Sequence, residues 1–359
     1  MASLTDLPLR GDLRGLSPYG APQKNVRVAL NVNENTHPLP QAVIDDVLAA
    51  LHDAVQNANR YPDREFRELR EALAGYLGHG LGEDNLWAAN GSNEILQQIL
   101  QAFGGPGRRV LGFPPTYSMY PLLARATGTE WVAGARGENF DLTPECVVGQ
   151  VGNIDPDLVF FCSPNNPTGT PLSLDTIAAA YDATDGIVVV DEAYAEFAPP
   201  GTTSALTLLP GRERLIVSRT MSKAFGFAGV RLGYLAADPV VSDALRLVRL
   251  PYHLSALTQA AAIAALANSG PLLDTVQQII VQRDRIMTEL PRLGFPVWPS
   301  WTNFVLFGGL ESPAAVFEEL LARDILIRDV GIAGHLRVTA GTEEETSEFL
   351  TAMAELSRQ

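Results

Sequence analysis

Cysteine is scarce in this sequence, whose 359 residues include only Cys146 and Cys162. Two thiols are too few for a disulfide framework, and this pair lacks the spacing of a metal site. We therefore expect no bound metal, and we expect both side chains to be small buried apolar groups. Such cysteine usage is typical of a reducing cytoplasm.

Positive charge is also in short supply. The chain carries 26 Lys and Arg residues against 41 Asp and Glu residues, which gives a formal net charge of −15. Nucleic acids and anionic membranes are bound by clustered cations, so the charge balance argues against both as partners. An anionic substrate would have to be bound by a few local cations.

Long apolar runs are missing as well. No stretch approaches the roughly 18 uncharged apolar residues that a membrane span needs. Residues 1–15 contain no apolar core of signal-peptide length. We expect a soluble protein in the cytoplasm.

The apolar content is nevertheless sufficient for a large folded protein. Hydrophobic residues make up 46% of the chain, and the length exceeds the roughly 250–300 residues at which a single core stops growing. We predict an N-terminal arm over residues 1–35, a large domain over 36–252 and a smaller domain over 253–359. The arm has many turn formers and little periodicity, which predicts an extended segment.

Helical and strand-like patterns alternate from about residue 40. The patterns predict helices over 42–55 and 66–77, and strands over 110–113, 157–162, 187–194 and 215–220. This alternation predicts an α/β domain with a mostly parallel sheet. The last part predicts a smaller α+β domain, helical over 254–292 and 313–323 and strand-like over 304–307, 325–328 and 335–340.

A lysine follows one of these strands in the segment SRTMSKAFG (218–226), which is rich in small and hydroxyl side chains. In a desolvated pocket Lys223 would lose its proton and could attack an aldehyde. Arg231, together with the hydroxyls of Ser222 and Thr220, is suited to a phosphate dianion. If each residue is considered alone, Lys223 could instead be an ordinary surface lysine, and Arg231 could belong to a surface ion pair.

A second anion site is predicted at the segment NGSNE (90–94), which runs directly into a helical pattern. Ser92 and Asn93 at a helix start would offer backbone N–H groups and the positive end of the helix dipole. A plain N-cap is the alternative explanation.

Polar residues also follow two of the predicted buried strands. Asp191 could face a pyridinium nitrogen and keep it protonated, and Ala193 on the same side is small enough to lie under a flat ring. Tyr194 could donate a hydrogen bond to the phenolic oxygen of that ring. Asn166, between two prolines in SPNNPTG (163–169), would present a rigid amide. The alternatives are a helix cap for Asp191 and an ordinary loop around Asn166.

These motifs in this order resemble the fold-type-I aminotransferases of class I and II, which use pyridoxal phosphate (PLP). The resemblance rests on SPNNPTG (163–169), DEAY (191–194) and SKAFGFAGVRLGY (222–234). It implies that Lys223 carries PLP as a Schiff base and that Asp191 pairs with the pyridine nitrogen. It also implies that Asn166 and Tyr194 bind the ring oxygen, that Tyr117 stacks on the ring, and that Ser92, Asn93, Thr220, Ser222 and Arg231 hold the phosphate.

Within this class the sequence is most similar to the histidinol-phosphate aminotransferases over nearly its whole length. The similarity runs through residues 8–23, 30–40, 60–63, 87–108 and 325–342. It implies transfer of an amino group between glutamate or 2-oxoglutarate and histidinol phosphate or imidazole acetol phosphate. It further implies a homodimer in which Tyr61 reaches the neighbouring subunit's cofactor phosphate, and substrate contacts from Tyr19, Asn33, Arg328 and Arg337. One departure is Thr36, where the family usually has proline.

Three alternatives remain open at this level. Arg328 and Arg337 could grip a carboxylate instead of a phosphate, so an aromatic amino-acid aminotransferase would share every cofactor residue. A PLP-dependent decarboxylase of a phospho-amino acid would have a similar sequence. A non-enzymatic regulator is disfavoured, because no basic DNA-binding segment is present and Lys223 is intact.

Overall fold

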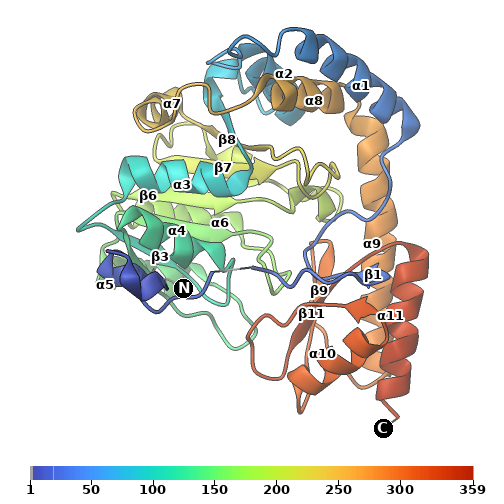
Figure 1. Ribbon diagram of the computed structural model, residues 1–359. Coiled ribbons are helices and arrows are strands. Elements are labelled where there is room, and N and C mark those ends of the chain that lie inside the picture. Colours follow the sequence, from blue (N-terminus) through green and yellow to red (C-terminus); the bar gives the residue numbers. More distant parts are fainter. Residues whose placement is uncertain (1–2, 19, 359) are drawn as a thin grey trace.

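The computed structural model describes residues 3–18 and 20–358, and seven strands of these residues form a central sheet (Figure 1). The strand order is β2-β8-β7-β6-β5-β3-β4, and only β8 runs antiparallel to its neighbours. The predicted α/β fold with a mostly parallel sheet is therefore confirmed. The bounds are β2 Leu86–Ala89, β3 Arg109–Gly112, β4 Glu130–Ala133, β5 Leu158–Cys162, β6 Ile187–Asp191, β7 Leu215–Thr220 and β8 Gly233–Ala237.

Within the central sheet, the apolar runs of the sequence predict β3, β5, β6 and β7 but not β2, β4 and β8. β2, β4 and β8 are short and contain alanine or glycine, so their strand signal is weak. β6 ends at Asp191, earlier than the predicted strand 187–194, because a 3₁₀ turn over Ala195–Phe197 follows closely.

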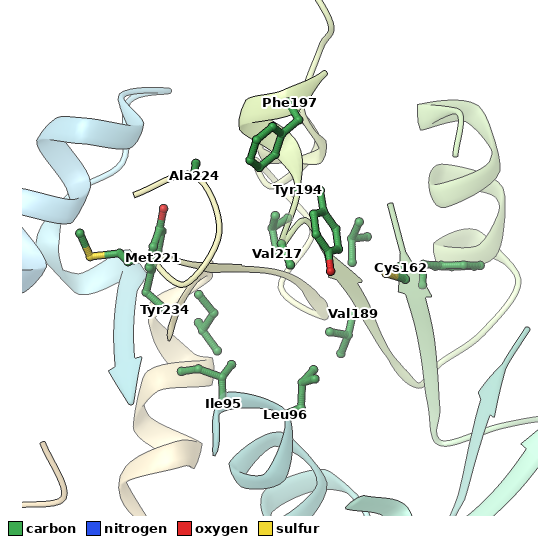
Figure 2. Packing of buried hydrophobic residues seen from close by; sticks show 14 of the residues in the cluster. Ile95, Leu96, Cys162, Val189, Tyr194, Phe197, Val217, Met221, Ala224 and Tyr234 are labelled. Atoms are coloured by element: carbon green, nitrogen blue, oxygen red, sulfur yellow. The ribbon is translucent and has the colours of Figure 1, made fainter. Parts of the chain in front are cut away.

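Helices precede and connect these strands, and several of them pack against the sheet. They are α1 Gln41–Gln56, α2 Arg67–Leu77, α3 Ser92–Phe103, α4 Met119–Thr127, α5 Pro144–Ile154, α6 Leu174–Asp182 and α7 Pro239–Arg246. In Figure 2, Ile95 and Leu96 of α3 point toward the strands that carry Val189 and Val217. All four side chains are buried, so α3 is fixed to the sheet by its apolar face.

The predicted helical stretch over 254–292 is divided into α8 Ala256–Ala267 and α9 Ser269–Arg292, which meet at 77°. α8 packs against α1 and α2, whereas α9 runs down to the C-terminal elements (Figure 1). Those elements are β9 Phe304–Phe307, α10 Pro313–Ala322, β10 Ile325–Leu326, β11 Leu336–Thr339 and α11 Glu343–Leu356. β9 and β11 form an antiparallel pair.

The later part of the N-terminal segment lies on the C-terminal elements, whereas Arg10 donates hydrogen bonds to the carbonyl oxygens of Arg125 and Ala126 in α4. Its strand β1, Val28–Ala29, pairs in parallel with β10, and the described part before it contains short 3₁₀ turns over Leu4–Asp6 and Gly11–Leu13. The division into residues 1–35, 36–252 and 253–359 stays a prediction.

Within residues 3–18 and 20–358, no single helix has the length and apolar composition of a membrane span. Among these residues, the bent pair α8 and α9 meets both criteria when the two helices are taken together. Apolar residues of both helices are packed in the core, among them Ala262, Leu272 and Ile279.

The carboxyl ends of three parallel strands lie side by side. Cys162 of β5 is opposite Asp191 of β6, and Asp191 is opposite Ser218 of β7. In open α/β sheets this edge is where ligands bind. The fold thus brings the loops around residues 163–169, 192–194 and 221–231 to one place.

Gly233 is needed where β8 meets the start of α3. A Cβ at this position would overlap the backbone nitrogen of Ser92 and the carbonyl carbon of Gly91. We expect Gly233→Ala to lower the free energy of unfolding by about 1–3 kcal/mol, because the helix start would have to move. Urea unfolding measures this change.

The matched control is Gly229→Ala in the turn that precedes β8. A Cβ on exposed Gly229 would meet no atom within 4 Å among the described residues, so its unfolding midpoint should stay at the wild-type value. Equal losses in the two variants would contradict the close approach of α3 to β8.

Candidate active site

A cavity of about 480 Å³ opens at the carboxyl edge of the sheet. Its wall combines the N-terminal segment, the strand ends and the loop around Arg328. It contains nearly every residue predicted for the site: Asn33, Ser92, Asn93, Tyr117, Asn166, Asp191, Tyr194, Thr220, Ser222, Lys223, Arg231, Arg328 and Arg337.

One predicted residue among those described, Tyr61, is not part of this wall. Tyr61 lies on the surface, where its side chain is 80% exposed and its ring stacks on Tyr252 at 4.4 Å between centroids. Tyr19 lies outside the described residues. A single chain therefore does not bring Tyr61 to the cavity.

Lys223 extends from the loop after β7, and its Nζ donates a hydrogen bond to the carbonyl oxygen of Val32 over 3.0 Å. Burial lowers the pKa of the amine to about 8, and the positive charges of Arg337 and Arg231 act in the same direction. The neutral, nucleophilic amine is thus accessible near neutral pH. A surface lysine would not show this combination.

Asp191 ends β6 with a buried carboxyl group that faces the cavity. The Tyr120 hydroxyl donates to Oδ2 over 3.0 Å, and the Ser218 hydroxyl donates to Oδ1 over 3.4 Å. Burial raises the pKa of Asp191 to about 6, although both hydrogen bonds oppose the rise. A buried carboxylate in this position is suited to a protonated ring nitrogen, and it caps no described helix.

Tyr120 is a residue of the site that the sequence did not predict. Its ring meets that of Tyr117 edge to face at 5.4 Å, and its hydroxyl group is bonded to Asp191. The signal available in the sequence was the spacing of Tyr117 and Tyr120 in PPTYSMY. Residues three positions apart share one face at the start of a helix.

A site for a dianion lies at the start of α3. The N-cap residue is Gly91, which provides no side-chain cap, so Ser92 and Asn93 belong to the first turn and their backbone N–H groups lack helical partners. The guanidinium of Arg231 lies against Gly91, at the position that a Cβ would occupy. Its Nη1 also donates to Ser222 Oγ over 3.5 Å. Helix dipole, guanidinium and hydroxyl groups together favour a phosphate.

Two hydrogen-bond donors line the middle of the cavity. Asn166 Oδ1 accepts a hydrogen bond from Arg337 Nη1 over 2.6 Å, so the amide nitrogen of Asn166 is directed elsewhere. The Tyr194 oxygen accepts a bond from Asn33 Nδ2 over 2.8 Å. Asn33, predicted as a substrate contact, is therefore bonded to a residue predicted to bind the cofactor.

Thr36 occupies the position where the family usually has proline. Its hydroxyl donates to Glu345 Oε2 over 2.7 Å. Threonine at this position thus lacks the rigid ring of proline but contributes a hydrogen bond between the N-terminal segment and α11.

The chain belongs to the class I and II aminotransferases, because the family's profile matches residues 26–353. Curated histidinol-phosphate aminotransferases are similar over the full length. The protein of Paenarthrobacter aurescens is 63% identical, with 98% of this chain and 96% of that protein covered. The protein of Thermobifida fusca is 55% identical with the same coverage.

Solved structures agree on the fold. The histidinol-phosphate aminotransferase of Sinorhizobium meliloti in complex with PLP superposes with a TM-score of 0.87 at 26% identity, and 98% of each chain is covered. An aspartate aminotransferase of Thermus thermophilus superposes with a TM-score of 0.81 at 24% identity over 92% of each chain, a likeness of fold alone.

Pyridoxal phosphate is the cofactor, and the donor set of the cavity fits it. When bound, PLP supplies an electron sink next to the reacting carbon. Lys223 would carry it, Asp191 would keep its ring nitrogen protonated, and the start of α3 with Arg231 would hold its phosphate. Tyr117 and Ala193, which both line the cavity, would lie against the ring.

The cofactor linkage can be tested sharply because the chain has only two lysines, Lys24 and Lys223. Borohydride reduction of the yellow protein should place PLP on Lys223 and leave exposed Lys24 unlabelled, as peptide mass spectrometry would show. The rate at which PLP joins the cofactor-free protein should rise with pH around a midpoint near 8, since only the neutral amine attacks the aldehyde.

The matched controls are Lys24→Ala, which should keep the visible absorption, and Lys223→Ala, which should lose it. A midpoint near that of an ordinary lysine, or a label on Lys24, would contradict the assignment.

Proposed function

We propose that this protein is a histidinol-phosphate aminotransferase that exchanges an amino group between glutamate and imidazole acetol phosphate. The observation that carries the proposal is the pairing of Arg328 with Arg337. Their backbones exchange two hydrogen bonds, of 3.0 and 2.9 Å, so the residues lie directly opposite each other. Both line the cavity.

Two opposed arginines suit a dianion. Side chains of directly opposite residues emerge on the same face of an antiparallel pair, which brings both guanidiniums to one side. In a chain of net charge −15 such a pair is a local attraction for phosphate. Curated relatives at 53–63% identity carry the same activity in their names, which supports the phosphate over a carboxylate.

The proton transfer falls to Lys223. Its amine, with a pKa of about 8, can both accept and release a proton, and it would do so beside the cofactor that this residue would carry. Tyr194 and Asn166 would hold the ring in place. Asp191 would preserve the charge on the ring nitrogen throughout.

The proposal predicts glutamate formation from histidinol phosphate and 2-oxoglutarate. Arg328→Ala should lower kcat/KM for histidinol phosphate by roughly ten- to a hundredfold, because one charge-assisted contact to the dianion is lost. The same variant should change kcat/KM for dephosphorylated histidinol much less. Arg337→Ala should harm both substrates, since Arg337 also holds Asn166.

Equal proportional losses for the two substrates in Arg328→Ala would contradict the phosphate clamp. Faster turnover of aromatic amino acids than of histidinol phosphate would favour the aromatic aminotransferase. Release of carbon dioxide from a phospho-amino acid would favour the decarboxylase.

We further propose a cytoplasmic homodimer in which Tyr61 completes the partner's site. In the isolated chain, large apolar residues of the region around Tyr61 and Tyr252 are exposed to solvent. Their exposed fractions are 86% for Leu247, 75% for Leu250 and 41% for Tyr252. Glu65 holds this region together through hydrogen bonds from Arg246 and Arg249. A second copy of the chain would cover the apolar side chains and receive Tyr61.

Mixed dimers test the exchange of Tyr61. Lys223→Ala and Tyr61→Ala should each be poorly active alone. Their co-expressed mixture should recover roughly one quarter of wild-type activity, because random pairing creates sites with Lys223 from one chain and Tyr61 from the other. Steady-state assays and sedimentation of the mixture measure this. Activity no higher than the parental mean would show that Tyr61 does not act across the interface.

A further inference from the structure

A buried polar network joins Tyr194 to the N-terminal segment and to β11. Asn33 Nδ2 donates to the Tyr194 oxygen over 2.8 Å, and the Thr339 hydroxyl donates to Asn33 Oδ1 over 3.2 Å. The backbone N–H of Asn33 in turn donates to Thr339 Oγ1 over 3.1 Å. All three residues are buried.

Together these hydrogen bonds determine which group donates and which group accepts in each contact. A backbone N–H can only donate, so the Thr339 oxygen accepts from it and gives its own proton to Oδ1 of Asn33. The amide of Asn33 is thereby oriented with its nitrogen toward Tyr194. Because the Tyr194 oxygen accepts from that nitrogen, its own proton is free to be donated elsewhere.

Tyr194 can donate that proton into the cavity, whose wall it forms. Burial raises the pKa of the phenol well above its ordinary value, which keeps the proton in place at working pH. Because the Tyr194 oxygen accepts a hydrogen bond from Asn33 and keeps its own proton, the phenol can act as a hydrogen-bond donor toward the cavity.

We propose that Asn33, oriented by Thr339, is a positioning residue that directs the Tyr194 proton to the ring oxygen of bound PLP. This inference rests on the assignment of PLP to Lys223. It gives Asn33 a role toward the cofactor in place of the substrate contact that the family resemblance implies.

Strand β11 also orients Asn166, the second hydrogen-bond donor expected at the PLP ring. Arg337 and Thr339 are two residues apart on β11, so their side chains share a face. Arg337 orients Asn166 directly, whereas Thr339 orients Tyr194 through Asn33. The backbone N–H of Thr339 also donates to the carbonyl oxygen of Leu30 over 2.9 Å, which holds the N-terminal segment beside the strand.

The backbone of Asn33 limits which variants are informative. Its φ of 58° lies in the left-handed region, which asparagine and glycine adopt more readily than other residues. Asn33→Gly therefore removes the amide without new strain. Thr339→Val keeps the shape of the side chain and removes only the hydroxyl.

The test is a pH titration of the visible absorption of the PLP-loaded protein without substrate. A hydrogen bond donated to the ring oxygen stabilises its anion and lowers the apparent pKa of this absorption. Tyr194→Phe should raise that pKa. Asn33→Gly and Thr339→Val should raise it in the same direction by roughly half to one unit.

Asn35→Ala is the matched control from the same segment. Its Nδ2 donates to Thr275 Oγ1 over 2.9 Å and to the carbonyl oxygen of Ala224 over 3.4 Å, so the variant removes a partly buried amide contact beside Lys223 without touching Tyr194, and its titration should coincide with wild type. A shift equal to that of Asn33→Gly would overturn the proposal in favour of general loosening of the segment.

Unshifted titrations of Asn33→Gly and Thr339→Val beside a shifted Tyr194→Phe would also overturn it. A wild-type protein without visible absorption would instead overturn the PLP assignment on which the inference rests. Failure of the inference and failure of the cofactor assignment are thus distinguishable.

Discussion

The register of β5, β6 and β7 at their carboxyl ends is the constraint on which the site depends. Cys162, Asp191 and Ser218 lie opposite one another, and parallel strands release their loops at the same edge. Asn166, Tyr194 and Lys223 follow these three ends in the chain. A slip of β6 by one residue would turn Asp191 to the other face of the sheet and separate it from the cavity.

Burial at this edge has opposite effects on the two main titratable groups. It lowers the pKa of Lys223 and raises that of Asp191, because low polarity disfavours the charged form of each. The lysine becomes a better nucleophile as a result. The carboxyl group retains its charge with the help of Tyr120 and becomes a strong partner for a cation.

The N-terminal segment connects the two halves of the cavity. Leu30 forms backbone bonds to Leu326 and Thr339, and the carbonyl oxygen of Val32 accepts the bond from Lys223. Asn33 then reaches Tyr194. Residues 30–33 therefore contact the C-terminal strands and the cofactor loops at once, so any displacement of the C-terminal elements would be transmitted to Tyr194.

The sequence by itself determined the parts of the fold and site that depend on local chemistry. Apolar runs identified four parallel strands, and polar or turn-forming residues directly after them identified Asn166, Asp191, Tyr194 and Lys223. Arg231 and the start of α3 were found in the same way. Each of these residues lies at or near a strand or helix end whose signal lies within a few neighbouring positions.

Only the tertiary structure decided which distant residues meet. Thr339 contacts Asn33 across 306 positions and Tyr120 contacts Asp191 across 71, and α8 packs against α1 and α2, which lie far from it in the sequence. Periodicity records which face of an element is apolar, but it does not name the partner of that face. Hydrogen-bond partners between separate elements are fixed by the packed geometry, where buried polar groups must be satisfied together.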